Sequence, residues 1–211
     1  MELIKPSYDI IAISNCPLEL IEQAGRTCYQ SEPFGEPESF VKKIINLGHH
    51  SVIEHASITI RFVIDRGVSH ELVRHRICAI SQESTRWCNY KHGVVFIIPA
   101  WCNISPGEYS ELLKDPGVSK GCADAIWFNA MLTSEADYLN LLELGWSPQQ
   151  ARSVLPNSLK TTVVMTANFR EWRHILVQRT SLRAHPQMRE VMVPLLAQLK
   201  SFLPEIFSDL E

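Results

Sequence analysis

The densest group of residues that could do chemistry is a cluster of arginines near the middle of the chain. Arg74 and Arg76 flank His75. Ser84 follows after seven intervening residues, and Arg86 lies two positions further on. A guanidinium group is a rigid fork of N–H donors that binds phosphate or carboxylate through two parallel hydrogen bonds. We therefore interpret the cluster as a phosphate site, although a solvated basic turn would have the same composition.

A second group of polar residues lies in the C-terminal third of the chain. On a helix that begins after Asn168, Arg170 and His174 fall on neighbouring turns, because residues four apart share a face. A polar outer helix face would explain the same spacing, and for Arg173 it is the interpretation that we favour. The whole group consists of Gln150, Arg152, Asn168, Arg170, Arg173, His174 and Arg179.

Histidines near glutamates suggest a metal site, but their spacing does not support one. A zinc-binding helix needs two histidines four residues apart, so that both rings meet on one face. His50 and His55 are five apart, and so are His70 and His75. The six cysteines form no CxxC pair, so we expect unreactive thiols and no metal ligands.

Composition excludes several classes of protein. The chain has 211 residues, 45% of them hydrophobic, and its 20 Lys+Arg against 23 Asp+Glu give a net charge of −3. A nucleic-acid binder would carry a basic field, so any anion site must be local. No stretch resembles a secretion signal or reaches the roughly 18 apolar residues of a membrane span, so we expect a cytoplasmic protein. Neither a G-x-G-x-x-G fingerprint nor a phosphate-binding GKS/GKT loop is present.

The hydrophobic pattern predicts the elements that position these residues. Ile58, Ile60, Phe62 and Ile64 alternate with polar residues, which is typical of a half-buried strand over residues 56–65. Upstream we expect a strand, then a helix that ends near Arg26, and then a loop over residues 31–37. The next helix should end at Gly48 and carry Phe40, Ile44, Ile45 and Leu47 on one face. Downstream we expect a short helix that Ser69 caps and that runs through Leu72 and Arg74. A loop over residues 76–86 and two strands within 87–98 should follow. Next we expect a helix over residues 119–144, whose core side chains would be Ala125, Leu132, Ala136, Leu139 and Leu142.

Capping signals define the C-terminal part. Ser147, followed by Pro148 and by Gln150 at the third helical position, predicts a helix that Pro156 ends. Asn168 and Glu171 predict another helix start of this kind. The remaining expected elements are a strand over residues 161–167 and a last helix that Pro186 opens and Pro194 kinks. Strands and helices are mixed without strict alternation, so we predict an α+β fold in a single domain over residues 1–211.

The run RHRICAISQES at residues 74–84 resembles the signature of the flavin-dependent thymidylate synthases, which is RHR, seven residues and Ser. Four flanking segments agree with that family in order and spacing. They are GHHSVIEH before the signature, and ARSVLP, NFREWRHILVQR and AHPQMRE after it. The resemblance covers about residues 20 to 195.

The resemblance implies an α/β fold with a central, mainly antiparallel sheet flanked by helices, in a homotetramer whose active sites are shared between subunits. It implies reductive methylation of dUMP to dTMP, with FAD as cofactor, NADPH as reductant and methylenetetrahydrofolate as one-carbon donor. FAD would lie at a subunit interface, which agrees with the missing dinucleotide fingerprint. No nucleic-acid or membrane partner is implied.

The family's site residues carry over by motif position. Arg179 matches an arginine beside the pyrimidine N3, where it would stabilise negative charge on the ring. The FAD contacts would be Ser51, Arg74, His75, Arg76, Gln82, Asn168, Phe169, Arg170 and His174. The dUMP contacts would be Glu71, Arg74, Gln82, Glu83, Ser84, Thr85, Arg86, Arg152 and Arg179.

Two positions depart from the family, and two alternative functions stay open. Glu71 stands where Gln is common, and a carboxylate beside a phosphate is unfavourable unless an arginine pairs with it. Trp87 stands where Tyr is usual. One alternative is an arginine-lined module that binds a nucleotide or an RNA loop without chemistry. The other is a flavoprotein on the same scaffold that acts on a different pyrimidine nucleotide.

Overall fold

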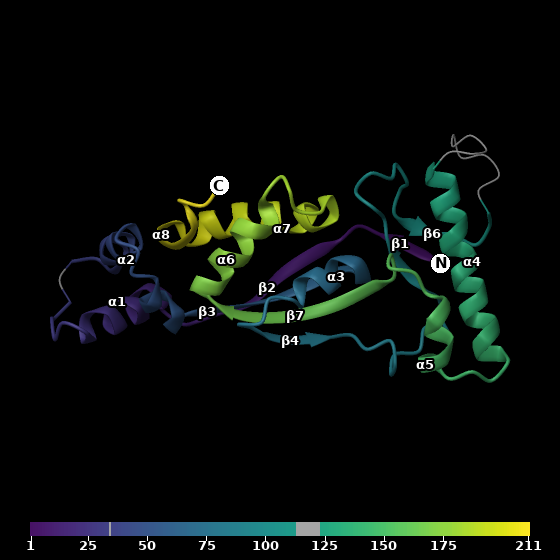
Figure 1. The fold of residues 1–211 in the computed structure, drawn as a ribbon, viewed down its shortest axis with the longest axis horizontal. Coiled ribbons are helices and arrows are strands. Elements are labelled where there is room, and N and C mark those ends of the chain that lie inside the picture. The colour runs from purple at the N-terminus through teal and green to yellow at the C-terminus, as the bar shows by residue number, and fades with distance from the viewer. Residues whose placement is uncertain (34, 113–122) are drawn as a thin grey trace. The chain divides into compact units, whose positions relative to one another are not determined.

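The computed structural model describes residues 1–33, 35–112 and 123–211 (Figure 1). Internal contacts divide the chain into two compact units, while a single domain over the whole chain stays a prediction. The first unit comprises residues 1–7, 63–72 and 82–163, and the second comprises residues 8–62, 73–81 and 164–211.

The first unit is built on a small sheet. In it β1 (Glu2–Ile4) pairs in parallel with β5 (Val95–Ile97) and antiparallel with β6 (Gly107–Glu108). The longest helix of the unit, α4 (Ala123–Glu143), packs against this core through the fully buried Phe128. The other helices of the unit are α3 (Arg66–Leu72), α5 (Pro148–Ala151) and η2 (Arg152–Val154).

The second unit holds most of the helices. Trp172 is fully buried in it, and its indole N–H donates to the backbone oxygen of Ile58 over 2.9 Å. The helices are α1 (Pro17–Thr27), α2 (Pro37–Asn46), η1 (His50–His55), α6 (Phe169–Thr180), α7 (Pro186–Phe202) and α8 (Pro204–Phe207).

A four-stranded sheet has the order β2 (Ser7–Ile13), β3 (Ser57–Asp65), β7 (Lys160–Asn168), β4 (Ala79–Gln82). The predicted alternation in β3 is confirmed, since residues 58, 60, 62 and 64 are all buried. β3 runs antiparallel to both neighbours, because its partners descend along the chain as β3 ascends. Hydrogen bonds and an ion pair join 57 to 14 and 61 to 9 on the side of β2, and 56 to 169 and 59 to 166 on the side of β7; residues 14, 56 and 169 adjoin the strand ends. The mixed α/β class is therefore confirmed, with antiparallel pairing of β3 to both neighbours beside the parallel pair of β1 and β5.

Two of the three helix caps that the sequence predicts are confirmed. Asn168 accepts the Glu171 N–H over 2.9 Å, and Ser147 forms the predicted capping box. The predicted cap at Ser69 is wrong, because α3 already begins at Arg66, and the predicted extent through Arg74 is wrong, because α3 ends at Leu72. Asp65 caps this helix, and its carboxylate accepts the Val68 N–H over 2.7 Å.

Two expectations about the middle of the chain are wrong. Residues 76–86 contain the strand β4, which lies at the edge of its sheet and shows no hydrophobic alternation. Residues 87–98 contain one strand, β5, preceded by turns at residues 85–87 and 91–92. Backbone pairing rather than side-chain pattern defines both segments, so periodicity does not detect them.

Two helix faces also differ from expectation. Leu47 lies past the end of α2 and is exposed, while Val41 takes the buried position. Gly48 has the left-handed φ of 75°, which agrees with its predicted role in ending the helix. Ala136 of α4 is exposed, and the fully buried Tyr138 packs in its place. The start predicted for that helix, residues 119–122, lies outside the described residues.

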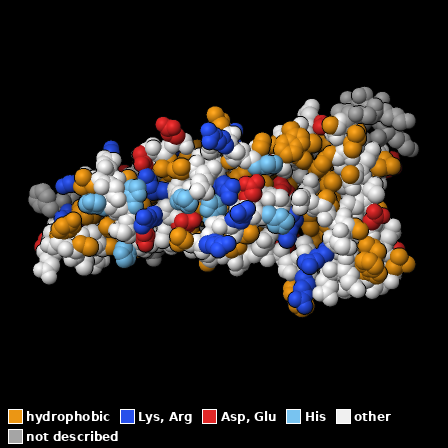
Figure 2. Space-filling view, viewed as in Figure 1, with side chains coloured by type: hydrophobic (Ala, Val, Ile, Leu, Met, Phe, Trp, Pro, Cys, Tyr) orange, Lys and Arg blue, Asp and Glu red, His pale blue; other side chains and the backbone are white. Residues whose placement is uncertain are grey.

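Charge of both signs is interspersed on the face of the molecule in Figure 2, which agrees with the near-neutral composition. None of the helices in the described ranges combines the length and apolar character of a membrane span. The five described cysteines are free thiols.

Candidate active site

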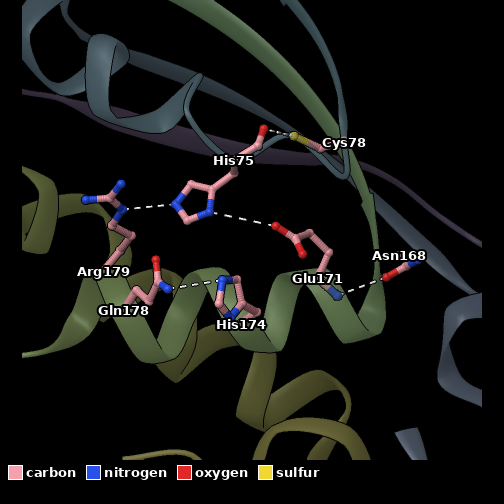
Figure 3. Close-up of polar contacts among 7 residues, drawn as sticks. All are labelled: His75, Cys78, Asn168, Glu171, His174, Gln178 and Arg179. Carbon is pink, nitrogen blue, oxygen red and sulfur yellow. Dashed lines mark hydrogen bonds and ion pairs between the residues drawn. The ribbon is translucent and has the colours of Figure 1, made fainter. Parts of the chain in front are cut away.

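The clearest polar site of the second unit forms where the predicted arginine cluster meets α6. His75, between α3 and β4, is almost completely buried, with 7% of its surface exposed. The Arg179 Nε–H, from the last turn of α6, donates to His75 Nε2 over 3.0 Å (Figure 3). These residues are 104 positions apart, so only the fold brings them together.

The spacing along α6 explains which other side chains join this site. Glu171, His174 and Gln178 follow one another at three and four residues, which aligns them along the helix. Gln178 Nε2 lies 3.0 Å from His174 Nε2, and the rings of His174 and His75 meet edge to face with centroids 6.1 Å apart. The sequence predicted His174 here but not Glu171 or Gln178.

His75 is a neutral ring at physiological pH. Its pKa is lowered from 6.5 to about 4, chiefly by burial, and the positive charge of Arg179 and the neighbouring His174 contribute in the same direction. An arginine N–H can only donate, so Nε2 accepts and the ring proton lies on Nδ1. His75 Nδ1 faces Glu171 Oε1 at 3.7 Å, which is longer than a direct hydrogen bond.

A hollow of about 480 Å³ opens beside these residues. Arg74 and Arg76 are exposed at its wall, so their guanidinium groups can reach an anion. Its lining consists of residues 74–77, Glu171, His174, Gln178 and Arg179. The structure thus joins Arg74, His75 and Arg76 of the first polar group with His174 and Arg179 of the second.

His75, Glu171 and His174 offer ligand atoms that lie within 4.8 Å of one another, which is the kind of group that can hold a metal ion. The Arg179 guanidinium donates to His75 at the same place, and its fixed positive charge opposes a bound cation. The geometry therefore favours an anionic or polar ligand over a metal.

A second set of predicted residues lies in the first unit, around the segment that follows β4. Gln82 Nε2 donates to Ser69 Oγ over 2.9 Å and to Thr161 Oγ1 over 3.2 Å. The Ser84 hydroxyl accepts the Arg86 N–H over 3.3 Å, which closes a tight turn. These contacts fix the backbone of the turn and leave the Ser84 hydroxyl proton available for a ligand.

Two arginines flank this turn. Arg152 Nη1 donates to Thr85 Oγ1 over 3.0 Å, and Arg86 Nε donates to Gln149 Oε1 over 3.1 Å. The Arg86 guanidinium also stacks over the exposed ring of Trp87, 5.1 Å from its centroid. Trp therefore offers the aromatic face that the family's usual Tyr would offer. Of the predicted phosphate cluster, Ser84 and Arg86 lie at this turn together with Arg152, whereas Arg74 and Arg76 belong to the second unit.

Glu83 supports the turn through a network that the sequence did not reveal. Its carboxylate accepts Lys160 Nζ over 2.7 Å and the Tyr90 hydroxyl over 2.8 Å. Burial alone would raise the pKa of this carboxyl, but the bonds from Lys160 and Tyr90 outweigh that effect and lower it. In this structure the Glu83 carboxylate is engaged with the protein itself.

The remaining predicted residues have varied surroundings. Asn168 caps α6, and Phe169 packs its fully buried ring on Phe207, so a ligand could reach only its backbone. Arg170 is exposed and paired with Glu54. Ser51, in η1, lines a separate hollow of about 430 Å³ in the same unit. Glu71 lies in the last turn of α3.

The interpretation of Arg173 as part of a polar outer face of α6 is wrong. Arg173 is buried, and its guanidinium donates two hydrogen bonds of 2.6 and 2.7 Å to the Asp209 carboxylate and another to the Ile206 oxygen. This fork ties the end of the chain to α6 and has a structural role.

Comparison with known proteins identifies relatives over almost the whole chain. A family model described as thymidylate synthase complementing protein matches residues 9–205. The flavin-dependent thymidylate synthase of Mycolicibacterium vanbaalenii is 35% identical over 199 residues, which cover 91% of this chain and 79% of that protein. The enzyme of the same name from Mycobacterium tuberculosis H37Rv is 33% identical over 202 residues, with the same coverage.

A solved structure has the same fold. The UMP/dUMP methylase PolB from Streptomyces cacaoi, crystallised with 5-Br UMP, matches with a TM-score of 0.75 and covers 99% of this chain and 95% of that chain. At 21% identity this likeness concerns the fold alone. The match of the family model and the identities to its members establish the family: this chain belongs to the thymidylate synthase complementing proteins, the family of the flavin-dependent thymidylate synthases.

Proposed function

We propose that this chain is a flavin-dependent thymidylate synthase that converts dUMP to dTMP, with FAD, NADPH and methylenetetrahydrofolate. The observation that carries the proposal is Arg179, a fixed guanidinium oriented by the neutral ring of His75 at a hollow with two further arginines. Membership of the family supplies the reaction class, and the residues of the hollow fit its chemistry.

The residues of the hollow fit FAD. Arg74 and Arg76 would hold the diphosphate by bidentate hydrogen bonds, and the His174 and Gln178 side chains would contact the ring system. FAD, when bound, supplies the hydride for the reduction. Ser51, Gln82, Asn168, Phe169 and Arg170 complete the proposed FAD contacts.

The turn after β4 fits the phosphate of dUMP. Ser84 would donate its hydroxyl proton, and Arg86 and Arg152 would neutralise the charge. Arg179 would stabilise negative charge at N3 and O2 of the uracil, so that C5 can accept the one-carbon unit. Glu71, Arg74, Gln82, Glu83 and Thr85 complete the proposed dUMP contacts.

Assembly and location are further parts of the proposal. The family resemblance favours a homotetramer with active sites shared between subunits, in the cytoplasm. It also favours action on the free nucleotide, which agrees with the absence of a net basic charge.

The test is release of tritium from C5 of labelled dUMP, measured with FAD, NADPH and the folate and with each omitted in turn. We expect release to depend on all three. A protein that stays colourless after addition of FAD would support a nucleotide-binding module instead. Faster flavin oxidation with UMP or dCMP than with dUMP would support a different pyrimidine substrate.

A further inference from the structure

Glu171 has no part in the proposed chemistry, yet its carboxylate points into the site. It is the third residue of α6, and its backbone N–H donates to the capping Asn168 (Figure 3). This bond fixes the first turn of the helix. The carboxylate consequently lies on the side of His75 opposite to Arg179, with Glu171 Oε1 3.7 Å from His75 Nδ1.

The side chains of Arg179, His75 and Glu171 lie in a row, with His75 between the other two. Arg179 can only donate, so His75 Nε2 must carry a lone pair toward it. The ring proton then lies on Nδ1, where the Glu171 carboxylate is the acidic neighbour. At 3.7 Å the carboxylate makes no direct hydrogen bond, but its negative charge favours the proton on the nearer ring nitrogen. The Cys78 thiol also donates to the His75 backbone oxygen over 2.7 Å, which holds the main chain.

We infer that Glu171 is a positioning residue for Arg179 and acts through the tautomer of His75. With the proton on Nε2 instead, two N–H groups would face each other and the Arg179 guanidinium would turn away. Arg179, His174 and Glu171 face His75 in the described part of this unit, and Glu171 is the acidic residue of the three. The kinetic part of the inference rests on the proposed function, in which Arg179 acts on the pyrimidine.

The kinetic test uses Glu171→Gln in the flavin-loaded enzyme, because Gln keeps the shape and removes the charge. We expect kcat to fall about tenfold, as for other residues that orient a site residue, with KM for dUMP and flavin content within twofold. Glu171→Asp should recover part of the loss. Glu19→Gln is the matched control, since Glu19 is the exposed acidic residue in the first turn of α1. It removes the same charge from a helix start and should leave kcat unchanged.

A double variant distinguishes positioning from a general structural effect. In an Arg179→Ala background, Glu171→Gln should change kcat by less than twofold, because the group that it positions is gone. Independent, multiplying effects of the two substitutions would overturn the inference, and so would normal kcat in Glu171→Gln alone.

A measurement without turnover separates this inference from the proposed function. Nitrogen-15 NMR of ring-labelled histidine, with His75→Gln for assignment, reports which nitrogen of His75 carries the proton. We expect Nδ1–H in the wild-type protein and a mixture of tautomers in Glu171→Gln. Nε2–H in the wild type would overturn the inference even if the enzyme makes dTMP. Nδ1–H with normal turnover in Arg179→Ala would instead contradict the proposed role of Arg179.

Discussion

At the residue scale, Arg179 combines a fixed charge with a fixed orientation. Its Nε–H is engaged with the buried His75, so the terminal nitrogens are directed by the protein before substrate arrives. Such preorganisation is worth most where negative charge develops in the transition state. Arg179→Ala should therefore lower kcat by about 100-fold or more, the cost of losing one such donor. Flavin content, read from absorbance, should change less. Near-normal turnover would assign Arg179 a structural role.

His75 makes the stability of the fold depend on pH in a defined direction. Its pKa is lowered from 6.5 to about 4, so between these values the unfolded chain binds a proton that the folded chain does not. The stabilisation is complete above about pH 6.5 and is lost as the pH falls through this window, by about 3 kcal/mol at most. Denaturant unfolding from pH 7 to pH 4 should show a smaller loss for His75→Gln than for the wild type. Equal losses would contradict the assigned pKa.

Ser84 is the one candidate nucleophile in the signature, and we expect it to bind rather than attack. A serine needs a base to take its proton, and the lowered pKa of His75, the titratable base of the signature, makes His75 a weak one. The Ser84 oxygen also accepts the Arg86 N–H, which suits a hydroxyl that donates to a phosphate. Ser84→Ala should weaken dUMP binding by about 1–3 kcal/mol and leave measurable turnover.

Titration calorimetry with dUMP and turnover at saturating dUMP test the Ser84 prediction together. A Ser84–uracil adduct trapped by mass spectrometry would contradict it. So would zero turnover at saturating dUMP in a folded, flavin-loaded Ser84→Ala protein.

At the element scale, the turn after β4 depends on a partly buried ion pair. Glu83→Gln would leave Lys160 without its carboxylate partner, and only one quarter of the Lys160 side chain is exposed, at 25%. We expect a loss of about 1–3 kcal/mol in the free energy of unfolding, together with a higher KM for dUMP as the turn loosens. Asp9→Asn is the control, because its pair with Arg61 is about half exposed and should cost less than about 1 kcal/mol. Equal losses in both variants would contradict the supporting role of Glu83.

Elements with strong local signals could be predicted from the sequence, and elements defined by pairing could not. The alternation in β3 and the Asn168 cap of α6 follow from residues next to each other in the chain. The strand β4 exists because its backbone pairs in the sheet, so nothing in its own side chains marks it. Asp65, and not Ser69, caps α3 because the strand β3 ends at Asp65. The end of that strand is set by tertiary structure, so the sequence near Ser69 does not show it.

The same distinction applies to the site. The motif residues Arg74, His75 and Arg179 could be selected from the sequence, but not the bond between His75 and Arg179 or the charge state of the ring. Lys160 and Tyr90 were missed for the same reason, since they meet Glu83 from distant parts of the chain. The sequence predicts Glu171 as part of the capping motif that begins α6. Its spacing of three residues from His174 along the helix is the signal that would have placed it in the site.

At the scale of the whole molecule, the proposed contacts divide between the two units. Most of the proposed FAD contacts belong to the second unit, and most of the dUMP contacts belong to the first. Arg74 and Arg179 are the proposed dUMP contacts in the second unit, and Gln82 is the proposed FAD contact in the first.

Flavin binding and assembly of the proposed homotetramer should be linked. If FAD binds between subunits, it binds the assembled protein and not the unfolded or separated chain, so it stabilises by mass action. At a free concentration of 100 times Kd the gain is about 2.7 kcal/mol, enough to raise the melting temperature by several degrees. Sedimentation with and without FAD, at falling protein concentration, should show the tetramer persisting to lower concentration when FAD is present. Arg76→Ala, which removes a proposed diphosphate contact, should weaken both effects together. A monomer that binds FAD tightly at high dilution would show that the cofactor site is complete within one chain.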